Sequence, residues 1–126
     1  MARLLLVDDE PRFRSYLGRI LESDGHEVRS AADEVGALEA LEGFAPDLLI
    51  ADWMLRSKTD GLGLAAMVRR RHPELAVVLI TGHPTDELKR HLAGRNIAAV
   101  LEKPFSTSAI REIVQRVLGP AAPEQD

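Results

Sequence analysis

The feature that most constrains the fold is a short aliphatic run that leads into one carboxylate. Leucine, leucine, isoleucine and alanine occupy residues 48–51, and Asp52 follows them directly. A short aliphatic run bounded by turn residues predicts a strand that is buried on both faces. In open parallel sheets, ligands bind at the carboxyl ends of the strands. We therefore expect Asp52 to stand at the floor of a site.

Three further aliphatic runs, at residues 4–7, 77–80 and 98–101, also lead into polar side chains. The polar residues that follow them are Asp8 and Asp9, Thr81, and Lys103. Because the carboxyl ends of parallel strands meet at one edge of a sheet, we expect these side chains to converge there.

Strand-like and helix-like segments alternate along the chain. Strands are predicted at residues 3–7, 27–31, 47–51, 75–80 and 98–101. Helices are predicted to begin at Pro11, near Asp33, near Leu62, after Pro84 and near Ser106. This alternation predicts an α/β fold with a parallel sheet. Right-handed crossovers allow few topologies for such a chain. We predict a flavodoxin-like, doubly wound five-stranded sheet of order 2-1-3-4-5 with five helices. This order places strands one and three side by side.

Two of the predicted helices carry specific packing expectations. In the second helix, Val35, Leu38 and Leu41 are expected to face inward. The fourth helix has only Leu88 and Leu92 as large apolar residues. We therefore expect the fourth helix to be held to the sheet by few contacts.

Length and charge restrict the class of protein. A chain of 126 residues is enough for one domain, which we assign to residues 1–119, with residues 120–126 as a tail or the start of a linker. The net charge of −4 gives no reason to expect direct binding to nucleic acid or to a membrane. The sequence has no cysteine, no signal peptide and no apolar stretch of transmembrane length, so we expect a cytoplasmic location.

The predicted edge brings together more negative charge than three carboxylates tolerate alone. Asp8, Asp9 and Asp52 would repel one another unless a cation lay between them. Carboxylate oxygens suit Mg²⁺, so the sequence predicts a magnesium site. Each residue taken singly has an ordinary explanation, because acidic residues after a strand often cap a helix and a lone lysine is usually solvated. The combination at four strand ends favours a functional site.

Five segments, spaced along residues 3–118, carry a resemblance to a known family. They are Leu-Leu-Leu-Val-Asp8-Asp9-Glu10, Asp47-Leu-Leu-Ile-Ala-Asp52, Asp60-Gly61-Leu62, Val78-Leu-Ile-Thr81-Gly82 and Lys103-Pro104-Phe105. Together they resemble the receiver domain of two-component response regulators. The Lys103–Pro104 peptide bond is a candidate for the cis form.

The resemblance implies a phosphoryl-transfer site centred on Asp52. In that family the central aspartate accepts a phosphoryl group from a histidine kinase or a phosphotransfer protein, and the domain then regulates a downstream effector protein or a fused output domain. It implies a signalling switch rather than an enzyme. The implied supporting groups are Asp8, Asp9 and the backbone carbonyl of Met54 for Mg²⁺, and Thr81 and Lys103 for the phosphate.

The chain departs from the family pattern at positions linked to output. Arg56 stands where a proline is common, and the loop before Asp60 is one residue longer than usual. Val100 occupies the position of a common aromatic switch residue. Valine has one χ angle and little reach, so output is expected to run through residues 81–84 and the weakly held helix after them.

Other classes of protein fit less well. A phosphatase of the haloacid dehalogenase type needs a second aspartate two residues after the nucleophile, where this chain has Met54. A flavodoxin-like cofactor site needs a phosphate-binding loop after the first strand, and Asp8, Asp9 and Glu10 would repel a phosphate without a cation. A non-phosphorylated pseudo-receiver that acts as a protein-interaction module remains the alternative.

Overall fold

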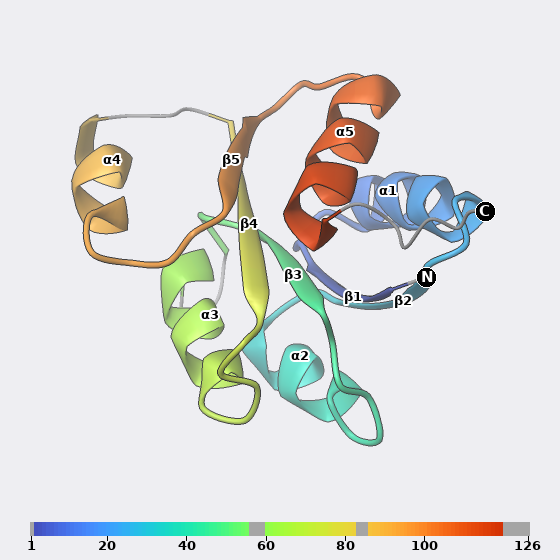
Figure 1. Ribbon diagram of the computed structural model, residues 1–126, viewed down its shortest axis with the longest axis horizontal. Coiled ribbons are helices and arrows are strands. Elements are labelled where there is room, and N and C mark those ends of the chain that lie inside the picture. The colour runs from blue at the N-terminus through green and yellow to red at the C-terminus, as the bar shows by residue number, and fades with distance from the viewer. Residues whose placement is uncertain (1, 56–59, 83–85, 120–126) are drawn as a thin grey trace.

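A computed structural model describes residues 2–55, 60–82 and 86–119, which form five strands and five helices (Figure 1). The strands are β1 (Arg3–Val7), β2 (Glu27–Ala31), β3 (Leu48–Asp52), β4 (Ala76–Thr81) and β5 (Ala99–Glu102). The helices are α1 (Pro11–Ser23), α2 (Glu34–Ala40), α3 (Gly61–Arg69), α4 (Asp86–Leu92) and α5 (Thr107–Leu118).

The five strands form one parallel sheet in the order β2-β1-β3-β4-β5. The predicted fold class and strand order are therefore confirmed. β3 is the central strand, and all five of its residues are buried because helices cover both faces of the sheet. The described helices are too short or too polar to cross a membrane.

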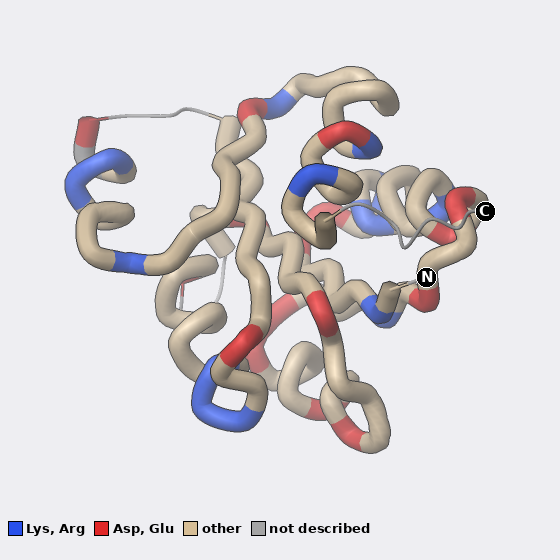
Figure 2. Tube along the Cα trace, viewed as in Figure 1, with Lys and Arg blue, Asp and Glu red and all other residues tan. Residues whose placement is uncertain are grey.

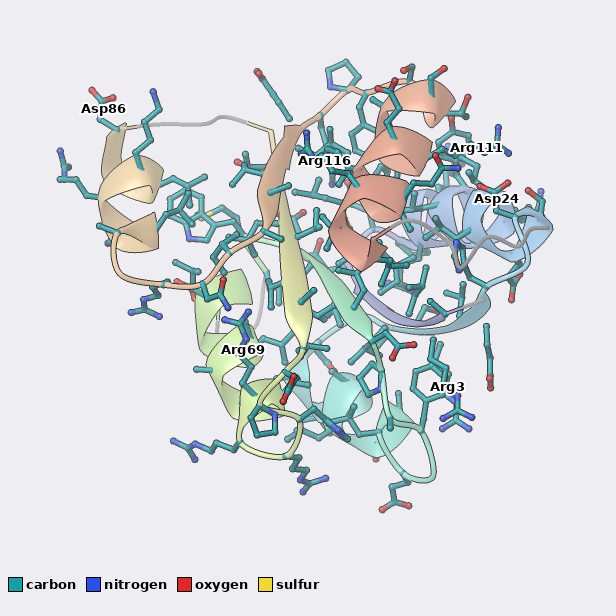
Figure 3. All side chains as sticks on the ribbon, viewed as in Figure 1. Arg3, Asp24, Arg69, Asp86, Arg111 and Arg116 are labelled. Carbon is teal, nitrogen blue, oxygen red and sulfur yellow. The ribbon has the colours of Figure 1, made fainter. Side chains whose placement is uncertain are left out.

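Two apolar layers make up the core, and they lie between the sheet and the helices on its two faces; the helices on either side of the sheet are seen in Figure 1. One layer packs α1 and α5 against the sheet, with Leu17 and Ile110 among its buried residues. The other packs α2, α3 and α4 against the opposite face, with Ala37, Val68 and Leu88 among its buried residues. Figure 3 shows Arg111 of α5 beside Asp24 at the end of α1, and an ion pair of 2.9 Å joins the two side chains.

The prediction that Val35 faces inward is wrong. Its side chain is 62% exposed, whereas Ala37 and Leu41 are buried and Leu38 is partly buried. α2 has only seven residues and buries one narrow face. Two positions along an α-helix correspond to a rotation of about 200°, so Val35 lies nearly opposite Ala37.

Few apolar side chains hold α4 in place, as the sequence predicts. Leu88 is 1% exposed and Leu92 is partly buried against the same apolar layer. The last turn of the helix is basic, with Lys89, Arg90 and His91. In Figure 2, basic residues gather on α4 and on the turn that follows α3.

Candidate functional site

Three aspartates meet at the carboxyl ends of β1 and β3. The two strands are neighbours, with Val7 of β1 paired with Ala51 of β3, so the residues that end them lie at the same edge. One oxygen each from Asp8, Asp9 and Asp52 lies within 4.8 Å of the others. Asp8 is 0% exposed and Asp52 is 9% exposed. The predicted convergence of these three carboxylates is present in the structure.

Each of the two buried aspartates directs one oxygen to its own backbone. Asp8 Oδ1 accepts a hydrogen bond of 2.8 Å from the backbone N–H of Glu10. Asp52 Oδ1 accepts one of 3.0 Å from the N–H of Met54. Aspartate commonly bonds the backbone two residues on, in a turn of this kind. The second oxygen of each carboxylate is therefore held toward the centre of the site.

Lys103 binds both of these inward oxygens. Its Nζ lies 3.0 Å from Asp8 Oδ2 and 3.2 Å from Asp52 Oδ2. The ammonium group also lies 4.2 Å from the centre of the Phe13 ring, which adds a cation–π contact. The Lys103–Pro104 peptide bond is cis.

The sequence interpretation missed a third carboxylate beside Lys103. Glu10 Oε1 lies 3.0 Å from Lys103 Nζ. Glu10 directly follows the aspartate pair, and this adjacency was the only signal in the sequence. Its contact depends on a residue 93 positions away, so no local pattern predicts it.

Burial and charge oppose each other at this site. Burial raises the pKa of the Asp8 carboxyl, while the backbone N–H of Glu10 and Lys103 counteract the effect. Burial disfavours the charged form of Lys103, but its hydrogen bonds to Glu10 and Asp8, with the charges of Asp8 and Asp52, raise its pKa above the usual value. Lys103 is therefore a cation, and it partly neutralises the aspartates.

Thr81 lies at the same edge of the sheet, at the end of β4, the strand next to β3. It is the last residue of β4, is 2% exposed, and follows Ile80, which pairs with Asp52. Its carbonyl oxygen accepts a hydrogen bond of 2.8 Å from the N–H of Lys103. The ends of β4 and β5 are thereby fixed beside the aspartates.

Comparison with known proteins identifies the family. The model of the response regulator receiver domain matches residues 4–115. The chain belongs to the response regulator receiver family. This family is a signalling module of two-component systems, and the predicted relationship is confirmed.

The similar proteins include regulators of nitrogen assimilation. The chain is 37% identical over 116 residues to the nitrogen assimilation regulatory protein NtrX of Azorhizobium caulinodans, covering 91% of this chain and 26% of that protein. It is 31% identical to the response regulator MprA of Mycobacterium avium, covering 98% of this chain and 54% of that protein. The solved receiver domain of NtrX from Brucella abortus is 37% identical, with a TM-score of 0.83, and the match covers 94% of this chain and 99% of that domain. The chain spans about a quarter of the length of the NtrX proteins that it matches.

The donor set of this receiver fits a small, hard divalent cation. Asp8, Asp9 and Asp52 supply three carboxylate oxygens within 4.8 Å of one another. Oxygen ligands of this type suit Mg²⁺, which typically binds through one or two carboxylates and retains water. The Met54 side chain is 64% exposed, and its N–H is bound to Asp52. The role of its carbonyl as a metal ligand stays a prediction.

Some expectations fall outside the part of the receiver that the structure describes. Arg56 and the longer loop before Asp60 include residues 56–59, and the loop proposed for output includes residues 83–85. Val100 is described and is partly buried in β5, against the apolar layer that includes α4.

Trp53, which follows the central aspartate, points away from the carboxylates. Trp53 directly follows β3, and its side chain is buried in the apolar layer of α2, α3 and α4, together with Leu49 and Ala51 of that strand. Its ring meets His91 of α4 edge to face, with a centroid distance of 6.1 Å. Trp53 Nε1 is buried and has no hydrogen-bond partner among the described residues. In this receiver, Trp53 joins the strand of the central aspartate to α4.

Gly61 allows the chain to return closely under the site. Its N–H donates a hydrogen bond of 2.9 Å to the carbonyl oxygen of Trp53. A Cβ atom at Gly61 would lie 2.6 Å from the carbonyl oxygen of Asp52 and 3.1 Å from Leu79 Cδ2. Only glycine fits this approach without a shift of the backbone, so Gly61 shapes the floor of the site.

Proposed function

We propose that this receiver is phosphorylated on Asp52 by a histidine kinase or a phosphotransfer protein, with Mg²⁺, and that it then changes conformation to regulate a partner. The observation that carries the proposal is the environment of Asp52. Its Oδ2 lies 3.2 Å from the Lys103 ammonium, and it shares a three-carboxylate site with Asp8 and Asp9. Asp52 is therefore a carboxylate nucleophile beside one cationic group at the carboxyl edge of a parallel sheet.

The geometry supports a direct transfer to one oxygen of Asp52. Oδ1 accepts a hydrogen bond from the N–H of Met54, so Oδ2 is the oxygen that attacks phosphorus once Lys103, which pairs with it at 3.2 Å, turns toward the phosphoryl group. The new O–P bond forms as the N–P bond of a phosphohistidine breaks, and the electron pair returns to the imidazole, which takes up a proton. Such a transfer depends mainly on positioning and charge neutralisation. A bound Mg²⁺ supplies positive charge to the phosphoryl oxygens.

Lys103 and Thr81 have complementary roles in this proposal. Lys103 offers a mobile positive charge that reaches a phosphoryl oxygen once it turns from its carboxylate partners. Thr81 offers a hydroxyl group from the next strand. Phosphorylation would then be read at the ends of β4 and β5, where both residues lie.

The proposed partners follow from the family. A histidine kinase or phosphotransfer protein supplies the phosphoryl group in the cytoplasm, and an effector protein or a fused output domain receives the signal. The NtrX and MprA proteins are longer than this chain. We propose a comparable arrangement, in which the receiver controls another domain or protein.

The test is phosphorylation of Asp52 by acetyl phosphate with Mg²⁺, measured by intact-protein mass spectrometry. Asp52→Asn is nearly isosteric and should abolish the 80 Da adduct, about the mass of one PO₃ group, while the protein stays folded. Asp47→Asn is the matched control, because Asp47 precedes the same strand at its opposite end and binds the N–H of Arg3 at 2.8 Å. The control should be labelled like the wild type. Labelling of Asp52→Asn at the wild-type level would refute the assignment.

A further inference from the structure

Glu10 occupies a different position from the other carboxylates that contact Lys103. Within the described chain, Lys103 Nζ contacts Asp8, Glu10 and Asp52, at 3.0, 3.0 and 3.2 Å. Asp8 and Asp52 belong to the group of oxygens that fits a metal ion, whereas Glu10 does not. The Glu10 side chain is 58% exposed, and that of Lys103 is 19% exposed. Glu10 therefore holds the ammonium group from the solvent side.

The local fold leaves the Glu10 side chain free for this contact. Glu10 is the N-cap residue of α1, but its side chain makes no capping hydrogen bond. Pro11 follows it and has no N–H, and the Glu10 N–H is bound to Asp8. The backbone thus fixes the position of Glu10, and its carboxylate extends across the site to Lys103.

We infer that Glu10 is a positioning residue that holds Lys103 over the site and competes with the incoming phosphoryl group for its charge. This inference rests on the proposed function. Lys103 reaches a phosphoryl oxygen only after it leaves its carboxylate partners. A divalent cation at the three aspartates would compete with Lys103 for Asp8 and Asp52, but it leaves Glu10 free to bind the ammonium. The strength of the Glu10–Lys103 ion pair then determines how readily Lys103 can bind a phosphoryl oxygen.

The size of the effect follows from the exposure of the pair. Ion pairs with an exposed partner are weak and are screened by salt. We therefore expect Glu10 to change a rate by a few-fold rather than to decide whether the reaction occurs. The effect should also shrink at high ionic strength.

The first experiment compares Glu10→Gln with Glu27→Gln. Glu27 is an exposed glutamate that pairs with Arg3 at 3.6 Å on the edge strand, so its variant removes the same charge elsewhere. With acetyl phosphate and saturating Mg²⁺, Glu10→Gln should phosphorylate about threefold faster than wild type, as expected for a weak ion pair. Glu27→Gln should match wild type. An unchanged or slower rate in Glu10→Gln would overturn the inference.

A double-mutant cycle separates an effect through Lys103 from simple repulsion of the anionic donor. In a Lys103→Met background, Glu10→Gln should no longer accelerate phosphorylation, because the residue that it restrains is absent. Equal acceleration in both backgrounds would show that only the charge matters, and would overturn the positioning role. The Mg²⁺ Kd of Glu10→Gln should stay within about twofold of wild type, since Glu10 lies outside the metal-binding group. A large loss of affinity would show that Glu10 is a metal ligand instead.

The last readout needs no phosphoryl transfer. In Mg²⁺-saturated protein without a donor, acetylation of Lys103 by an amine-reactive ester is measured by mass spectrometry, with exposed Lys89 as the internal reference. Lys103 should react several-fold faster in Glu10→Gln and at the wild-type rate in Glu27→Gln. If Asp52 is labelled normally but the reactivity of Lys103 is unchanged in Glu10→Gln, the inference about Glu10 is overturned and the proposed function is not. Failure of wild type and Glu27→Gln to label Asp52 overturns the proposed function, and with it the role of Glu10 in phosphorylation.

Discussion

At the scale of single residues, the site depends on close approaches that tolerate little change. Asp52 Oδ1 accepts a hydrogen bond from the Met54 N–H and Oδ2 one from Lys103, and Gly61 leaves no room for a Cβ beside the Asp52 carbonyl oxygen. The Asp52 carboxylate is thus positioned by side-chain contacts and by backbone packing together. A change at Gly61 moves the backbone of Asp52 without altering any charged group.

Gly61→Ala is expected to destabilise the domain and to slow phosphorylation. A Cβ atom 2.6 Å from the Asp52 carbonyl oxygen forces a backbone shift, and overpacking of this kind costs about 1–3 kcal/mol. Gly18→Ala is the control, because a Cβ at Gly18 of α1 meets nothing within 4 Å. It should stabilise the helix by about 0.5–1 kcal/mol. Urea denaturation measures the free energy of unfolding of both variants, and equal stability of the two would contradict this account.

At the scale of elements, α4 is a helix that few apolar side chains hold to the sheet. It has seven residues, with Leu88 as its buried side chain and Leu92 partly buried. His91 of α4 also contacts the ring of Trp53, the residue that follows Asp52 and β3. Val100 of β5 packs against the same layer and cannot act as an aromatic switch. A change at Asp52 is therefore expected to reach α4 through Trp53 and the end of β4.

Amide exchange tests the response of α4. Before activation, the amides of Asp86–Leu92 should exchange faster than those of Thr107–Leu118, because fewer apolar contacts oppose local opening. Beryllofluoride with Mg²⁺, which imitates the phosphoryl group, should change protection across residues 86–96 and leave α2 unchanged. Trp53 emission should change at the same time, since its ring contacts His91. Unchanged protection across residues 86–96 would exclude α4 as the output element.

At the scale of the whole molecule, the charged groups that form the site also lower the stability of the fold. Acidic and basic residues are spread along the chain (Figure 2), but the site concentrates the carboxylates of Asp8, Glu10 and Asp52 around Lys103. Burial raises the pKa of the Asp8 carboxyl above its ordinary value of 3.8, so ionised Asp8 opposes folding. This cost is fully present above the folded pKa, and it disappears as the pH falls through the folded pKa toward 3.8.

Asp8→Asn is expected to raise the Tm at pH 7 in the absence of divalent cations. Asparagine keeps an oxygen for the Glu10 N–H and removes a buried charge. The difference from wild type should shrink as the pH is lowered. Mg²⁺ at ten times its Kd should stabilise wild type by about 1.4 kcal/mol and should not stabilise the variant. Thermal unfolding with EDTA or Mg²⁺ measures both effects, and a lower Tm of Asp8→Asn in EDTA would show that the ion pair with Lys103 outweighs burial.

The sequence by itself determined the order of the sheet and the polar residues at its carboxyl edge. Aliphatic runs of four to six residues identify four of the five strands, all except β2, and right-handed crossovers leave few ways to arrange them. The convergence of Asp8, Asp9 and Asp52 follows directly from that order. These features depend on local pattern and chain direction, which a sequence contains.

Only the tertiary structure decided how side chains from distant segments meet. The ion pair between Glu10 and Lys103, the contact of Trp53 with His91 and the passage of Gly61 under Asp52 depend on how strands and helices are aligned in space. The exposure of Val35 has a related cause, because a short helix buries only the side that its neighbours cover. Periodicity shows that a helix has an apolar face, but the packing of the sheet selects the residues that lie on it.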